Sequence, residues 1–131
     1  MGYRSEVTVT MYNADFINLV GRAKSESETA YQLLQAASIY QTDKFTTLHF
    51  DWIKWYTDYD DIKFIEGFLY DVPYVFRRVG ESCDDIECFE NDIADYDMLD
   101  CVYVVTGLDI ENAGVPINLD GKAIEEGVCY V

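Results

Sequence analysis

The chain has 131 residues, about half of them apolar, and carries 25 acidic against 9 basic side chains for a formal net charge of −16. This length predicts a single domain, and the apolar fraction excludes an intrinsically disordered chain. A charge of this sign repels nucleic acids and anionic membranes and attracts cations or basic protein surfaces. We therefore expect a basic protein as partner and no direct binding of nucleic acid. The oligomeric state stays open.

No targeting signal or metal motif stands out. The first residues contain no apolar core of signal-peptide length, and no stretch approaches the roughly 20 apolar residues of a membrane helix. The cysteines are Cys83, Cys88, Cys101 and Cys129, without a Cys-x-x-Cys pair, and the one histidine, His49, is remote from them in sequence. We expect a cytoplasmic protein with free thiols, without a structural zinc, a cofactor or a membrane segment.

The N-terminal third predicts a strand followed by helix. Residues 7–12 alternate apolar and polar side chains with several β-branched ones, which is typical of a strand with one buried face. Asn13 is placed to cap a helix. The predicted buried face of that helix carries Phe16, Leu19, Val20 and Ala23. Ser25 and Glu28 form a capping-box pattern, which indicates either a kink or a second helix, and both possibilities stay open.

Residues 45–56 predict a second strand and contain both tryptophans. Alternation places Leu48, Phe50 and Trp52 on one face and His49, Asp51, Ile53 and Trp55 on the other. Because both faces carry bulky side chains, this strand should be central in the sheet. We expect one core between helices and sheet that contains Phe50, Trp52, Ile65, Phe68 and Val104.

The remaining elements follow from apolar spacing and turn residues. An apolar stripe predicts a helix that Asp58 or Asp60 can cap and that Pro73 ends. The stripe consists of Ile62, Ile65, Phe68 and Leu69. Strands are predicted at 74–79, with Arg77 and Arg78 paired internally with carboxylates, at 86–89 and at 101–106. From residue 107 onward we expect loop, with one edge strand at 127–131.

Together these elements predict an α+β fold. We expect a mainly antiparallel β-sheet of four to five strands with two or three helices packed on one face. The sequence shows no internal repeat and no linker, so residues 1–131 should form one acidic α+β domain.

Three motifs occur in a fixed order along the chain. They are the opening Met-Gly-Tyr-Arg-Ser-Glu-Val, Trp-x-x-Trp-Tyr at 52–56, and Phe-Arg-Arg-Val-Gly-Glu at 76–81 followed by Asp-Asp-Ile-Glu at 84–87. Up to about residue 90 the chain resembles a group of small acidic proteins encoded by bacteriophages and prophages. The resemblance implies a phage origin, a location in the host bacterial cytoplasm and an early, host-directed role. It supplies no catalytic residue, and it includes neither the cysteines nor the tail after residue 107.

Between residues 81 and 100 the chain has nine carboxylates and no basic residue. They are Glu81, Asp84, Asp85, Glu87, Glu90, Asp92, Asp95, Asp97 and Asp100. Like charges this dense destabilise a fold unless a partner or ions neutralise them. Duplex DNA carries one charge per ~1.7 Å of its axis, so such a surface can occupy the nucleic-acid groove of a basic protein. Asp58, Asp60 and Asp61 would extend the surface if their helix begins near it.

Catalytic and metal-binding interpretations are weaker. Cys83 and His49 could serve as nucleophile and base, but no signature surrounds the cysteine. Asp95, Asp97 and Asp100 offer hard oxygen ligands, but the glycine and glutamate of an EF-hand loop are missing, so no metal site is expected.

The preferred hypothesis is therefore a non-enzymatic phage inhibitor that mimics DNA. It would bind a basic channel of a host nucleic-acid-targeting defence system, in an anti-CRISPR or anti-restriction role. One alternative is a protein-protein interaction or regulatory module with an aromatic surface around Trp55, Tyr56 and Tyr59. A hydrolase is a further alternative, and a solvated loop remains the simplest interpretation of the acidic segment.

Overall fold

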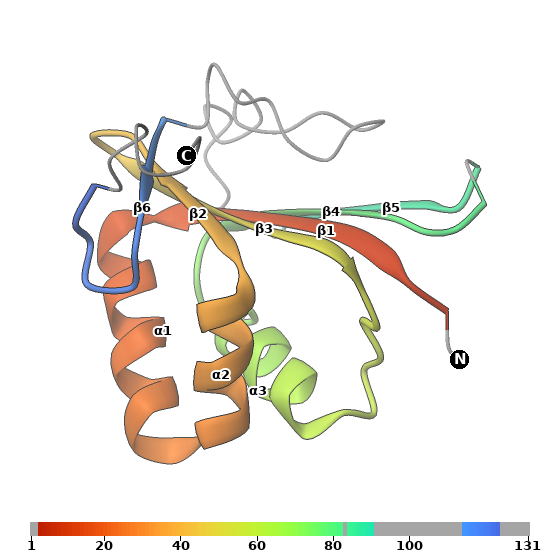
Figure 1. Ribbon diagram of the computed structural model, residues 1–131, viewed down its shortest axis with the longest axis horizontal. Coiled ribbons are helices and arrows are strands. Elements are labelled where there is room, and N and C mark those ends of the chain that lie inside the picture. The colour runs from red at the N-terminus through yellow and green to blue at the C-terminus, as the bar shows by residue number, and fades with distance from the viewer. Residues whose placement is uncertain (1–2, 83, 91–113, 124–131) are drawn as a thin grey trace, which may run out of the picture.

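The computed structural model describes residues 3–82, 84–90 and 114–123. The elements in chain order are β1 (Ser5–Tyr12), α1 (Asn13–Glu26), α2 (Glu28–Ala36), β2 (Ser38–Gln41), β3 (Phe45–Ile53), α3 (Asp60–Leu69), β4 (Tyr74–Val79), β5 (Ile86–Glu90) and β6 (Val115–Ile117). All three helices lie on the same face of the sheet (Figure 1). The predicted α+β fold with helices on one face is confirmed.

The sheet is antiparallel and has six strands within the described residues, against the four to five predicted. Its order is β5-β4-β1-β3-β2-β6, so β1 and β3 occupy the centre. The prediction that β3 is central is confirmed, and β4 has the predicted bounds. The strands predicted at 101–106 and 127–131 lie outside the described residues.

Two strands were missing from the sequence-based prediction. β2 has four residues, of which only Ile39 is buried, so its alternation is too short to recognise. β6 lies in a stretch predicted to be loop, because it contains Pro116 and follows Gly114. It pairs with β2 at the end of the described sheet, and proline is tolerated in such edge strands.

The core lies between the helices and the covered face of the sheet. α1, α2 and α3 contribute Phe16, Leu19, Ala23, Ala30, Leu34, Ile62, Ile65, Phe68 and Leu69, and the central strands contribute Val7, Val9, Met11, Leu48 and Phe50. The predicted apolar stripe of α3 is thus buried as expected. Of the predicted face of α1, Phe16, Leu19 and Ala23 are buried and Val20 is partly buried. Burial of this apolar surface is the main driving force for the fold.

The helix boundaries differ from the predicted caps. α1 and α2 are separate helices, and Ser27 caps α2 by accepting a hydrogen bond from the Ala30 amide to its Oγ at 3.2 Å. The capping box at Ser25 and Glu28 was therefore wrong. Asn13 is the first residue of α1; it donates from its side chain to the carbonyl of Thr42 at 3.1 Å. α3 begins at Asp60 with Tyr59 at its N-cap position, so neither predicted aspartate is the cap.

A β-bulge near the end of β3 overturns the placement of the two tryptophans. Ser5 pairs with Ile53 and Val7 pairs with Phe50, so one residue of β1 opposes two residues of β3. Trp52 lies in this bulge with a positive φ of 58°, and 49% of its surface is exposed. The extra residue reverses the alternation of side chains. The prediction that Trp52 belongs to the core was therefore wrong.

Trp55 takes the core position instead. It follows β3, is 8% exposed, and packs against Phe50 and Phe76 with ring centroids 5.4 and 5.8 Å away. Of the other residues predicted for the core, Phe50, Ile65 and Phe68 are buried, while residue 104 lies outside the described part of the chain.

Candidate functional site

The turn between β4 and β5 is the first part of the predicted acidic surface. Gly80 donates from its amide to the carbonyl of Asp85 at 2.8 Å, and the Tyr3 hydroxyl donates to the Asp85 carboxylate. Glu81 accepts a 2.7 Å hydrogen bond from the Arg4 amide. A Cβ on Gly80 would lie 2.2 Å from the Tyr3 hydroxyl, so only glycine allows this close approach. The N-terminal segment thus contacts the acidic turn at Glu81 and at Asp85.

Arg78 forms ion pairs with two of the predicted site carboxylates. Its guanidinium donates to Asp85 Oδ1 at 2.8 Å, to Glu87 Oε1, and to the hydroxyl of Ser5 at 2.8 Å. The predicted internal pairing of Arg78 is therefore confirmed. Because these two carboxylates already have a cation, they shape the turn and contribute less charge to an external partner.

The pairing of Asp85 should make stability depend on pH. The Tyr3 hydrogen bond and then Arg78 hold the pKa of Asp85 below its usual range. A lowered folded-state pKa contributes stability above the usual value of about 3.9, which is lost as pH falls through the lowered pKa. We expect Asp85→Asn to be less stable than the parent protein at pH 7, with a difference that shrinks below about pH 3.9. Urea denaturation across this pH range measures both quantities.

Asp84→Asn is the matched control, because Asp84 is an exposed neighbour in the same turn and forms no ion pair with a residue that the structure describes. It should leave stability nearly unchanged at every pH. A difference for Asp85→Asn that stays constant down to about pH 2.5, more than one unit below the usual aspartate pKa of about 3.9, would contradict an origin in the carboxylate charge.

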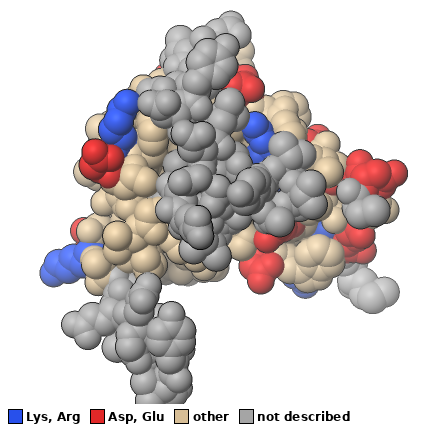
Figure 2. Space-filling model, turned by 90° about the horizontal axis from the view of Figure 1, so that it is seen from above, with Lys and Arg blue, Asp and Glu red and all other residues tan. Residues whose placement is uncertain are grey.

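Three other carboxylates of this segment remain exposed. Glu81, Asp84 and Glu90 form no ion pair within the described residues. Figure 2 shows acidic side chains gathered at the right-hand end of the molecule, where Figure 1 places the turn between β4 and β5. We call Glu81, Asp84 and Glu90 the exposed acidic set. Asp92, Asp95, Asp97 and Asp100, which were predicted to belong to the same surface, lie outside the described residues.

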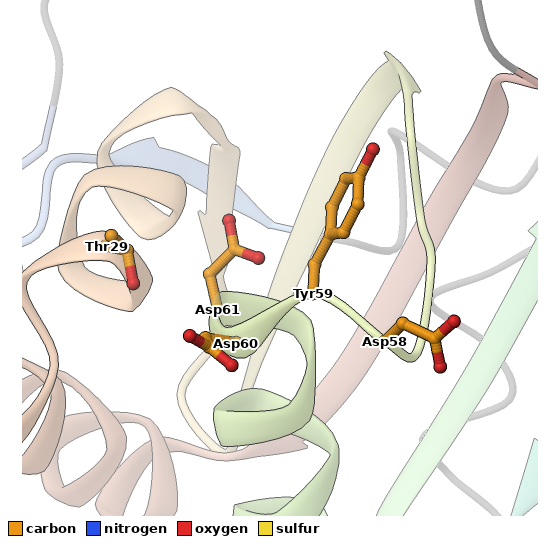
Figure 3. Close-up of a pocket in the computed structure, with 5 residues that line it drawn as sticks. All are labelled: Thr29, Asp58, Tyr59, Asp60 and Asp61. Atoms are coloured by element: carbon orange, nitrogen blue, oxygen red, sulfur yellow. The ribbon is translucent and has the colours of Figure 1, made fainter.

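Asp58, Asp60 and Asp61 form a second acidic region at the N-terminus of α3. With Thr29 and Tyr59 they line a hollow of about 390 Å³. Figure 1 shows the segment that enters α3 below the sheet, well separated from the β4–β5 turn. The three carboxylates point in different directions (Figure 3). Asp60 and Asp61 also lie in the first turn of α3, where negative charge stabilises the helix dipole.

A further hollow, which sequence reasoning missed, lies between α3, β4 and β5. It has a volume of about 210 Å³ and is lined by Glu66, Leu69, Tyr70, Tyr74, Phe76 and Phe89. We call it the aromatic hollow. Phe76 and Phe89 are directly paired across β4 and β5, with ring centroids 5.7 Å apart. The two-residue spacing of Tyr74 and Phe76 on β4 places both rings on one face of the sheet, which the sequence could have indicated. That Phe89 of β5 lies beside them depends on strand register.

Glu66 is the carboxylate that lines the aromatic hollow, and it is partly buried. Its Oε2 accepts a 3.3 Å hydrogen bond from the indole of Trp55, and among the described residues no Lys or Arg pairs with it. Burial raises the pKa of Glu66, the Trp55 hydrogen bond opposes this, and the charge of Glu87 raises the pKa further. The pKa of Tyr74 is raised by burial and by the charge of Glu66.

His49, the residue considered as a catalytic base, is largely buried and lies beside a carboxylate. Its Nε2 lies 2.8 Å from Glu6 Oε2, and only 14% of the histidine side chain is exposed. Cys83, the residue considered as a nucleophile, lies outside the described residues.

Arg77 is buried and donates from Nη1 to the carbonyl of Phe76 at 2.9 Å. Within the described residues Arg77 pairs with no carboxylate, so its predicted pairing stays a prediction. The Arg4 guanidinium donates to the carbonyl of Trp52 at 3.2 Å.

Comparisons with protein-family models, curated proteins and solved structures gave no match. None of the helices in the described residues has the length and apolar character needed to span a membrane. Across residues 3–82, 84–90 and 114–123, no three His, Cys, Asp or Glu side chains converge as metal ligands would.

Proposed function

We propose that the protein is a non-enzymatic, phage-encoded inhibitor of a host nucleic-acid-targeting defence system. Its acidic surface would bind the basic channel that a CRISPR effector or a restriction enzyme uses for nucleic acid. The observation that carries this proposal is the exposed acidic set in a chain of net charge −16. Glu81 and Asp84 lie in the β4–β5 turn, which the N-terminal segment contacts, and Glu90 is the last residue of β5. A rigid display of carboxylates lowers the entropic cost of binding a basic groove.

The pairing of Asp85 and Glu87 with Arg78 sharpens the proposal. Direct contacts with a basic partner fall mainly to the exposed acidic set. Asp85 and Glu87, paired with Arg78, support the turn together with the hydrogen bond from the Arg4 amide to Glu81. Asp58, Asp60 and Asp61 offer a second contact region on the helical side. Contacts that are spread over many partly exposed charges act mainly on the association rate and weaken as salt rises.

The test is the triple variant Glu81→Lys, Asp84→Lys and Glu90→Lys. Its association rate with purified CRISPR effectors and restriction enzymes should fall by roughly tenfold or more, with little change in dissociation. The same rate for the parent protein should fall between about 50 and about 500 mM salt. Duplex DNA should compete, because both ligands need the same basic surface.

The matched control reverses three exposed aspartates elsewhere, at positions 43, 51 and 120. This control changes the net charge by the same amount. If the exposed acidic set contacts the partner, the association rate should fall much more for the first triple variant than for the control. A salt-independent association rate, or simultaneous binding of the protein and DNA, would overturn the DNA-mimic proposal.

Those results would favour the alternative of an aromatic interaction module, in a corrected form. Trp55 is buried and does not form part of an aromatic surface, whereas Trp52 and Tyr59 are 49% and 43% exposed. Tyr59 packs edge-on against Tyr56, with ring centroids 5.0 Å apart.

A further inference from the structure

The aromatic hollow combines a partly buried carboxylate with four aromatic rings. Glu66 lies among Tyr70, Tyr74, Phe76 and Phe89, and its described partner is the neutral indole of Trp55. An acid in an apolar environment without a cation is unfavourable for folding, whereas a bound cation would neutralise it. Aromatic faces attract the same kind of ligand through their quadrupole. We propose that the aromatic hollow binds an arginine side chain of the partner protein.

The size of the hollow favours a single side chain. Its volume of about 210 Å³ is below the roughly 300–1,000 Å³ of typical small-molecule pockets. Arginine suits it better than lysine, because a planar guanidinium can stack on a ring and still donate to a carboxylate. Tyr70 and Phe89 are 85% and 50% exposed at the rim, so a side chain can reach the hollow from solvent.

The carboxylates near the aromatic hollow are negatively charged, as binding of a cationic arginine side chain requires. Glu87 lies near enough to Glu66 to influence its titration, and Glu90 is an exposed residue on the same strand as Glu87 and Phe89. Arg78, on the same strand as Phe76, is engaged by Asp85 and Glu87. The inference rests on the proposed function in one respect, since it takes the arginine to come from the same basic partner.

The test uses a small ligand and needs no partner protein. The indole N–H of Trp55 donates to Glu66 at 3.3 Å, so its NMR signal reports directly on the carboxylate. Titration of ¹⁵N-labelled protein with Nα-acetyl-arginine amide should shift this signal saturably. The corresponding lysine derivative should bind more weakly, and the neutral citrulline derivative should leave the signal unmoved. The exposed Trp52 indole serves as an internal reference.

Variants decide whether the carboxylate and the rings carry the binding. Glu66→Gln keeps an oxygen for the Trp55 hydrogen bond but removes the charge, and it should weaken arginine binding at least about tenfold. Phe89→Leu should weaken it several-fold. Glu28→Gln removes an exposed charge on α2 and should leave binding unchanged.

An equal response to citrulline, or unchanged binding by Glu66→Gln with a well-dispersed spectrum, would overturn the cation site. An equal response to the lysine derivative would overturn the assignment to arginine. Neither result depends on the exposed acidic set, so failure of this inference is distinguishable from failure of the proposed function.

Discussion

Replacing Trp55 with alanine is expected to lower the free energy of unfolding by about 3–5 kcal/mol, the usual cost of removing a buried large aromatic. Trp55 is 8% exposed and fills the space between Phe50 and Phe76. The substitution leaves a cavity there and also removes the donor to Glu66. The loss is measured by chemical denaturation followed by circular dichroism, which does not depend on tryptophan emission.

Trp52→Ala is the matched control, because it removes the same side chain two positions after Phe50. With 49% of Trp52 exposed, the free energy of unfolding should change by only about 0.5 kcal/mol. Equal losses for the two variants would contradict the β-bulge, since a regular strand would bury Trp52 instead.

Gly114→Ala is expected to lower the free energy of unfolding by about 2 kcal/mol or more. Gly114 has φ +105°, a conformation that strains any L-residue, and an added Cβ would lie 2.1 Å from the backbone oxygen of Gln41. Relief of this clash requires β6 to move away from β2, which costs the hydrogen bonds between them. Thermal and urea denaturation measure the loss.

The variant Gly121→Ala is the control that tests backbone strain without a steric clash. Gly121 also has a positive φ of +80°, but a Cβ there would meet nothing within 4 Å. This variant should lose only about 1 kcal/mol, the typical cost of the left-handed conformation. If Gly114→Ala lost no more than Gly121→Ala, the close approach to Gln41 would make no contribution to stability.

Much of the fold could be predicted because its signals are local. Side chains repeat their direction with a fixed period within a helix or a strand, and backbone geometry sets that period. This repeat accounts for the alternation in β1, the apolar stripe of α3 and the bounds of β4. Caps were less predictable, because Ser25, Ser27 and Asn13 are all chemically capable of capping. Which of them caps a helix depends on where the chain turns.

Only the amino-acid composition of the candidate site could be predicted from the sequence. The acidic residues from Glu81 to Glu90 are visible in the sequence, but their pairing is not. Arg78 reaches Asp85 and Glu87 across the β4–β5 ladder, and Tyr3 is brought to the turn from the far end of the described chain. The aromatic hollow was missed for the same reason, since Glu66 of α3 and Phe89 of β5 line one hollow only in the folded arrangement.

By itself the sequence determined the charge, the α+β class and the apolar faces of the helices, because each is set by residue type and by periods within one element. The tertiary structure alone decided which tryptophan is buried, which carboxylates stay exposed and where aromatic rings surround Glu66. These features depend on strand register and on one β-bulge. A shift of one residue moves a side chain from one face of a sheet to the other, and no single stretch of sequence encodes that shift.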